Sequence, residues 1–184
     1  MVPEMDGKVS DEYSAVSEPE NEMLNIYPAT TKAGDKTLED YLALPDDRRV
    51  ELIDGVFYDM AAPSCMHQSI ALEIWKCLAD FVKGNRGSCI PFAAPADVQL
   101  FNDDKTMVQP DVFVVCDRDK ITKQRLIGAP DLIVEVVSPG SRELDVHLKL
   151  LKYRQAGVRE YWIVIPDEKK VLVENEDGDT AEIN

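Results

Sequence analysis

Two short stretches of the chain each carry one acidic residue in an otherwise apolar run. Residues 132–137 read LIVEVV, with Glu135 inside the run, and residues 111–115 read DVFVV, with Asp111 at its start. Both runs have the length and the β-branched composition of a buried strand. A carboxylate in such surroundings is costly unless it is paired or coordinated. The two acids are therefore the first candidates for chemistry.

Strand geometry predicts where these two carboxylates point. Side chains alternate between the faces of a strand, so Glu135 shares a face with Ile133 and Val137. If the two strands are neighbours, Asp111 meets Glu135, and close carboxylates repel unless they share a proton or a divalent cation. We expect neighbouring strands and one shared cation. The structural alternative is that Asp111 caps a strand end and that Glu135 pairs with an arginine in the core.

The residues after Glu135 predict a helix that returns across the sheet. A turn at 138–140 leads into a helix from about 142 to 156, and EYWIVI at 160–165 forms the next strand. Strand, helix and strand together predict a crossover unit in a mixed sheet flanked by helices. Helical spacing places Lys149 and Lys152 on one side of this helix.

The earlier part of the chain predicts smaller elements around this α/β unit. They are a short helix capped by Thr37 that runs to Leu44, a hairpin that turns at Asp54-Gly55, a long helix ended by Gly84, and two strands around a polar turn at 102–105.

Four motifs in serial order carry a resemblance to a known family. They are ELIDGVFYDMAAPSCMHQSI, VQPDVFVV, PDLIVEVVSPGSRELDVHLKLLKY and GVREYWIV. Together they closely resemble the bacterial "putative restriction endonuclease" family of the PD-(D/E)XK nuclease superfamily, over roughly residues 37–166. The resemblance implies a restriction-endonuclease-like α/β fold, with a central mixed sheet and helices on both sides.

The resemblance also implies a metal site. Asp111 and Glu135 would hold Mg²⁺, for which Mn²⁺ can substitute, and Glu51 of ELIDG would complete the site. In the superfamily a lysine two residues after the glutamate helps to position the attacking water, but that position is Val137 here. Lys149, on the following helix, would take over this role.

Several residues leave structural alternatives open. An acid beside an Asp-Gly turn usually faces solvent, which is the alternative for Glu51, and a helical lysine usually faces water, which is the alternative for Lys149. Lys152 competes with Lys149 for the same role. We expect His67 to cap local backbone, with a place near the cleft as the alternative, and Asp97 is a further acidic candidate. The resemblance also matches Arg142, Asp145 and Tyr153 to family positions.

The implied function is Mg²⁺-dependent hydrolysis of DNA phosphodiester bonds. The metal would polarise the phosphodiester and lower the pKa of its bound water, while the lysine stabilises developing negative charge. DNA is the expected partner, with a homodimer left open. Two rivals belong to other classes: a catalytically silent nuclease-fold module that binds a partner, and a metal-dependent hydrolase of a small phosphorylated substrate.

The net charge of −15 argues against nucleic acid, but its distribution weakens that objection. A net charge of −6 on residues 1–30 and of −5 on residues 167–184 leaves −4 for the rest. Residues 1–30 are acidic and lack periodicity, which predicts a mostly disordered tail. Residues 31–184 are expected to form a single nuclease-like domain.

The cellular compartment is expected to be the cytoplasm. The sequence shows no secretory signal and no apolar run long enough to span a bilayer. The four cysteines, Cys65, Cys77, Cys89 and Cys116, form no CxxC pair, which argues against a structural zinc site. We therefore expect reduced, buried thiols.

Overall fold

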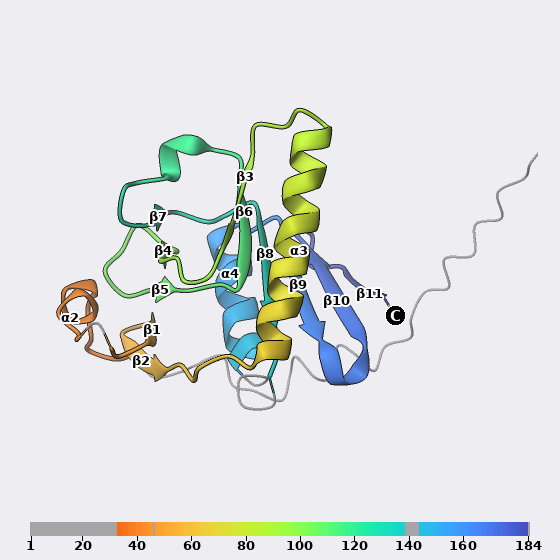
Figure 1. Cartoon of the computed structure of the whole chain (residues 1–184). Helices are drawn as coiled ribbons and strands as arrows, with labels where there is room; N and C mark the ends of the chain where they lie inside the picture. Colours follow the sequence, from red (N-terminus) through yellow and green to blue (C-terminus); the bar gives the residue numbers. More distant parts are fainter. Residues whose placement is uncertain (1–32, 46, 139–143, 184) are drawn as a thin grey trace, which may run out of the picture. The chain divides into compact units, whose positions relative to one another are not determined.

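The computed structural model describes residues 33–45, 47–138 and 144–183 (Figure 1). The predicted acidic tail, residues 1–30, lies outside these residues, so the division into a tail and a domain over 31–184 remains a prediction. The helices are α2 (Leu38–Leu42), α3 (Cys65–Gly84), the 3-10 turns η1 (Arg118–Lys120) and η3 (Pro166–Glu168), the π-helix η2 (Leu144–Lys149) and α4 (Leu150–Ala156). The strands are β1 (Val50–Ile53), β2 (Val56–Asp59), β3 (Ile90–Ala93), β4 (Val98–Gln99), β5 (Met107–Val108), β6 (Val112–Val115), β7 (Leu126–Ile127), β8 (Leu132–Val136), β9 (Glu160–Ile165), β10 (Lys170–Asn175) and β11 (Thr180–Ile183).

A six-stranded mixed sheet forms the centre of the fold, in the order β11-β10-β9-β8-β6-β3. Strands β8 and β9 are parallel and are joined through η2 and α4, whereas their other neighbours pair antiparallel. The predicted crossover and the α/β class are thereby confirmed. Gly157, in the left-handed conformation with φ 82°, ends α4 and turns the chain toward β9.

A second sheet was not anticipated by the sequence. It has five strands in the order β2-β1-β5-β4-β7, and only its β4–β7 pair is parallel. The segment expected to be one strand before Cys116 is divided between the two sheets, because β5 ends at Val108 and β6 begins at Val112. Pro110 lies between them and has no N–H to donate to a ladder, so it suits a point where the chain changes sheet.

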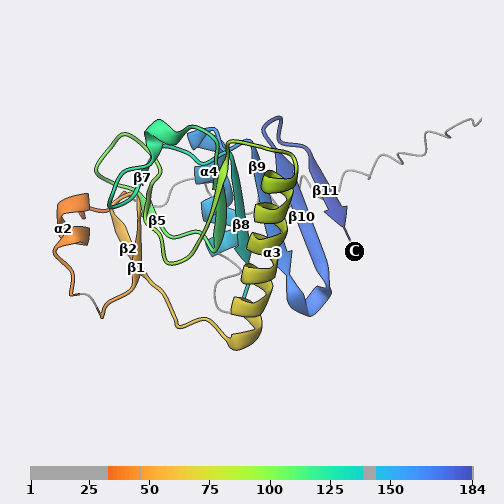
Figure 2. The ribbon, with the colours of Figure 1, turned by 45° about the horizontal axis from the view of Figure 1, so that its top comes forward.

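Helices cover both faces of the six-stranded sheet, as expected. In the ribbon views α3 lies on one side of β8 and α4 on the other (Figure 1, Figure 2). Val134 and Val136 pack on the α3 side with Ala71, whereas Ile133 and Val137 belong to the cluster on the α4 side. Glu135 therefore shares the face that α4 covers, as strand alternation predicted.

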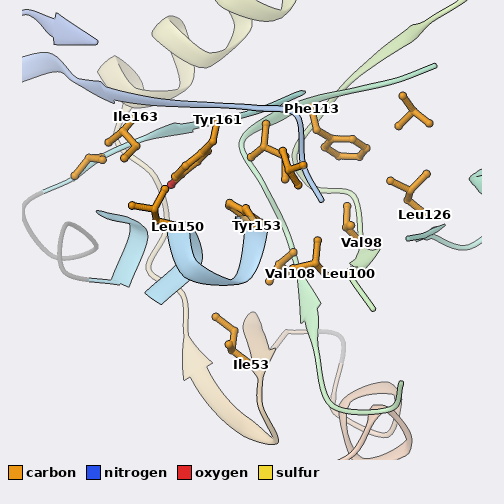
Figure 3. Close-up of a cluster of buried hydrophobic side chains, with 14 of the residues drawn as sticks. Ile53, Val98, Leu100, Val108, Phe113, Leu126, Leu150, Tyr153, Tyr161 and Ile163 are labelled. Atoms are coloured by element: carbon orange, nitrogen blue, oxygen red, sulfur yellow. The ribbon is translucent and has the colours of Figure 1, made fainter. Parts of the chain in front are cut away.

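The larger apolar cluster joins the two sheets to α4 (Figure 3). Phe113 and Ile163 come from the six-stranded sheet, Ile53 and Val108 come from the five-stranded sheet, and Tyr153 comes from α4. The second sheet is thus anchored over the same face of β6 and β8 that carries the acidic residues. This packing brings β1, β8 and α4 together around one polar point in the core.

The expectation of reduced, buried thiols was wrong. Cys89 and Cys116 form a disulfide, and Cys65 and Cys77 are free but exposed. The pairing follows from the strands, because Ile90 and Val115 are partners in β3 and β6 and the cysteines stand next to them. Among the described residues, no helix combines the length and the apolar character that crossing a bilayer requires.

Candidate active site

Asp111 and Glu135 lie opposite each other at one end of the paired strands β6 and β8. Val112 pairs with Val134 in the antiparallel register, so the next residues along, Asp111 and Glu135, face each other. The backbone N–H of Asp111 donates to Oε2 of Glu135 at 3.4 Å, and that of Val136 donates to Oδ2 of Asp111 at 2.8 Å. The predicted neighbouring strands are confirmed. Backbone N–H groups orient both carboxylates at the strand ends.

Lys149 reaches this pair from the helical crossover. Its ammonium lies 3.0 Å from Oε1 of Glu135 and 2.9 Å from Oε2 of Glu51, and the residue is only 3% exposed. Two carboxylates around one buried ammonium offset the cost of removing its charge from water. Lys149 closes the π-helix η2, a wide turn that is frequent at functional sites. Val137, the position of the usual lysine, packs instead in the larger apolar cluster.

Glu51 is buried rather than facing solvent, although it lies close to an Asp-Gly turn. It is 1% exposed within β1. Its Oε2 accepts from Lys149, and its Oε1 accepts from the backbone N–H of Gln109 at 2.8 Å. The five-stranded sheet thus places Glu51 in contact with Lys149, and the Lys149 ammonium links Glu51 to Glu135.

Lys152, the competing lysine, contacts a different element. Its ammonium lies 2.6 Å from Oδ2 of Asp54, in the β1–β2 turn. Asp54 has a left-handed backbone with φ 50°, as does Gly55 with φ 76°, which matches the predicted two-residue turn. Lys152 therefore pairs at the hairpin, and Lys149 is the lysine at the acidic pair.

Two further residues touch the acids. The Tyr153 hydroxyl donates to Oε1 of Glu135 at 2.8 Å, and His67 Nε2 lies 3.1 Å from Oδ2 of Asp111. Burial raises the pKa of Tyr153 well above its ordinary value, helped by the charge of Glu135, so the hydroxyl stays protonated as a donor. The backbone of His67 is capped by Ser64, while its side chain supplies the contact to Asp111 that the sequence left only as an alternative.

Asp97 belongs to a neighbouring polar network. Its Oδ1 accepts from the Tyr41 hydroxyl at 2.9 Å and from the side-chain amide of Gln109 at 2.8 Å. Burial, followed by the charge of Asp97, raises the pKa of Tyr41. Gln109 links this network to the site, because its backbone N–H holds Glu51. Among the described residues, the side chain of Asp97 bonds to Tyr41 and Gln109 and not to Asp111 or Glu135.

The donor set suits Mg²⁺ held by two carboxylates rather than by a closed cage. Within the described part of the chain, no three His, Cys, Asp or Glu side chains converge on one point as a metal cluster. Mg²⁺ is commonly bound by one or two carboxylates, with waters and substrate oxygens filling its other positions. Asp111 and Glu135 provide such a pair. With Glu51 and Lys149 they carry a formal charge of −2, which a divalent cation would balance.

Comparison with known proteins places the chain in a family. Residues 38–182 match the model of the Uma2 family, described as "Putative restriction endonuclease". The chain belongs to the Uma2 family. The slr1290 protein of Synechocystis is 28% identical over 152 residues, which cover 79% of this chain and 78% of that protein. A crystal structure from Anabaena variabilis, described as a putative nuclease belonging to DUF820, has 25% identity and a TM-score of 0.67, covering 80% of this chain and 83% of that one. The predicted restriction-endonuclease-like family and fold are confirmed.

Proposed function

We propose that this Uma2 protein is a Mg²⁺-dependent endonuclease that hydrolyses phosphodiester bonds in DNA. The observation that carries the proposal is the facing pair of carboxylates, Asp111 and Glu135, with the Lys149 ammonium 3.0 Å from Glu135. Two acids and a cation at one point form the set that metal-assisted phosphodiester hydrolysis needs.

Each residue has a separate task in this proposal. Asp111 and Glu135 would hold the metal, which when bound polarises the phosphodiester and lowers the pKa of a coordinated water. Lys149 would orient or activate the attacking water and stabilise the negative charge that develops on the phosphate oxygens. Glu51 also holds the Lys149 ammonium, and it would serve as a third metal ligand if that ammonium moved.

The proposal is tested by measuring metal binding and DNA cleavage on the same samples. With Mg²⁺ or Mn²⁺, the wild-type protein should melt at a higher temperature and should cut supercoiled DNA. Glu135→Gln and Asp111→Asn keep the side-chain shapes, and each should remove the metal-dependent rise in melting temperature and the cleavage. Asp59→Asn, an exposed acid on β2 paired with Arg48, is the matched control and should retain both.

Two outcomes would favour the rival functions. A wild-type protein with neither a metal-dependent melting shift nor cleavage would be a silent binding module. A protein that leaves DNA intact but hydrolyses bis(p-nitrophenyl) phosphate with Mn²⁺ would be a hydrolase of small phosphorylated substrates. The overall acidity of the chain suits that second rival, since a net charge of −15 repels a DNA polyanion.

A further inference from the structure

The Tyr153 hydroxyl is a buried group at the site to which the proposed reaction gives no role. We propose that Tyr153 is a positioning residue that fixes which oxygen of Glu135 is presented to the metal. The inference rests on the proposed metal site and adds to it a means of selecting Mg²⁺ over Ca²⁺.

The two oxygens of Glu135 have different surroundings. Oε1 accepts from the Tyr153 hydroxyl at 2.8 Å and from the Lys149 ammonium at 3.0 Å. Oε2 is the oxygen turned toward Asp111, whose backbone N–H donates to it at 3.4 Å. Lys149 and Tyr153 are four residues apart, one helical turn, so they approach Oε1 from the same side of the crossover.

Packing holds the hydroxyl in place. Tyr153 is 1% exposed, and its ring meets the ring of Tyr161 edge to face, with centroids 5.0 Å apart. A phenylalanine would fill the same apolar space, so packing in the core does not by itself explain the Tyr153 hydroxyl. The hydroxyl donates to Oε1 of Glu135 at 2.8 Å, a contact that phenylalanine cannot make. Tyr153 therefore holds Oε1 of Glu135 from a position that packing fixes.

When one oxygen of a carboxylate is held by hydrogen bonds, the carboxylate tends to bind a metal through its other oxygen alone. Mg²⁺ demands near-ideal octahedral geometry, whereas Ca²⁺ accepts more ligands and often takes both oxygens of a carboxylate. With Oε1 held by two donors, we expect the metal to meet Oε2, the oxygen that faces Asp111. Loss of the hydroxyl leaves the Lys149 ammonium at Oε1 but removes the second restraint, so Glu135 can turn more easily and offer both oxygens, which favours Ca²⁺.

The test compares Tyr153→Phe with the control variant Tyr58→Phe. Tyr58 lies in β2 and packs against the same apolar cluster. Mn²⁺ affinity is measured by titration calorimetry, and Ca²⁺ and Mg²⁺ affinities by competition with Mn²⁺. In Tyr153→Phe we expect Mn²⁺ to bind about 10- to 100-fold more weakly, the scale for residues that orient a metal ligand. The ratio of Ca²⁺ to Mg²⁺ affinity should rise, while Tyr58→Phe should keep wild-type values.

A purely structural role for Tyr153 would lower the melting temperature of the metal-free protein without moving the Ca²⁺ to Mg²⁺ ratio. That result, with Mn²⁺ affinity equal to that of Tyr58→Phe, would overturn the proposal. A wild-type protein that binds no Mn²⁺ would overturn both this proposal and the proposed function. If the ratio shifts as expected but the wild type cuts no DNA, only the proposed function fails.

Discussion

The ammonium of Lys149 lies 3.0 Å from Oε1 of Glu135, although the two residues are 14 positions apart in the sequence. The strand that carries Glu135 cannot supply a cation itself, because Val137 is packed in the apolar cluster on the same face. The helical crossover between β8 and β9 brings the lysine back over the strand end. In the site that we propose, a cation from the helix would take the place of a lysine on the strand.

We predict that Lys149→Ala slows DNA cleavage by roughly 10- to 1000-fold, the scale of one electrostatic donor. Mn²⁺ affinity should be nearly unchanged, because the loss of a positive charge beside the metal offsets the loss of a donor to Oε1 of Glu135. Lys152→Ala should cut at close to the wild-type rate, because Lys152 pairs with Asp54 at the hairpin turn. Rates are measured under single-turnover conditions with saturating Mn²⁺, so that metal binding and chemistry are separated.

Folding has to be followed in the same experiment. Removing Lys149 leaves two buried carboxylates without their shared cation, which costs about 3–5 kcal/mol of stability for a pair of this kind. Lys149→Met, which keeps most of the side-chain volume, serves as the second variant, and melting curves identify the temperature range in which each variant is folded. Wild-type cleavage by folded Lys149→Met would refute the role of this lysine.

We predict that His67→Ala weakens Mn²⁺ binding about tenfold. His67 Nε2 lies 3.1 Å from Oδ2 of Asp111, so the imidazole restrains a carboxylate that we assign to the metal. Met66→Ala is the matched control, since Met66 is the neighbouring helical residue and is 67% exposed. Equal Mn²⁺ affinities for the two variants, measured by calorimetry, would show that the imidazole has no part in holding Asp111.

We predict a pH-dependent stability difference between the wild type and Glu174→Gln. Burial raises the pKa of Glu174 above its ordinary value of 4.5, although the bond from Arg154 opposes that shift. The folded state therefore binds this proton more readily than the unfolded state. As the pH falls from 7 through the raised pKa toward 4.5, the wild type should gain stability relative to Glu174→Gln. Urea denaturation of both proteins at several pH values measures the difference, and a constant difference would contradict the prediction.

The sequence predicted elements whose signals are local. The apolar alternation around Glu135 predicted its face, Asp54-Gly55 predicted the hairpin, and Thr37 caps α2 with Asp40 in a reciprocal pair. The division of the chain at Pro110 was not predictable in the same way. A proline indicates a strand boundary, but no neighbouring residue indicates that the strands on either side belong to different sheets.

From the residues alone, the site was predictable only where a residue conflicted with its surroundings, whereas Glu51 and Lys149 came from the family resemblance. Asp111 and Glu135 were visible as acids in apolar runs, because burial of a charge demands a partner. His67 and Tyr153 sit on helices, where a histidine in a first turn and a tyrosine on an apolar face raise no such conflict. Their contacts depend on how α3 and α4 pack against the sheet, and the spacing of residues along the sequence does not predict that packing.

We predict that Cys89→Ser together with Cys116→Ser lowers stability by about 3–4 kcal/mol, from the loop entropy of a bridge across 27 residues. No sequence motif indicates this pairing, because the cysteines meet only through the register of β3 and β6. Cys65→Ser with Cys77→Ser is the control and should be neutral, since both thiols are free and exposed. Urea denaturation, with and without dithiothreitol, measures the free energy of unfolding of each protein.

Dithiothreitol should lower the stability of the wild type to that of the Cys89 and Cys116 double variant and leave that variant unchanged. Equal wild-type stability with and without the reductant would show that no bridge stabilises the fold.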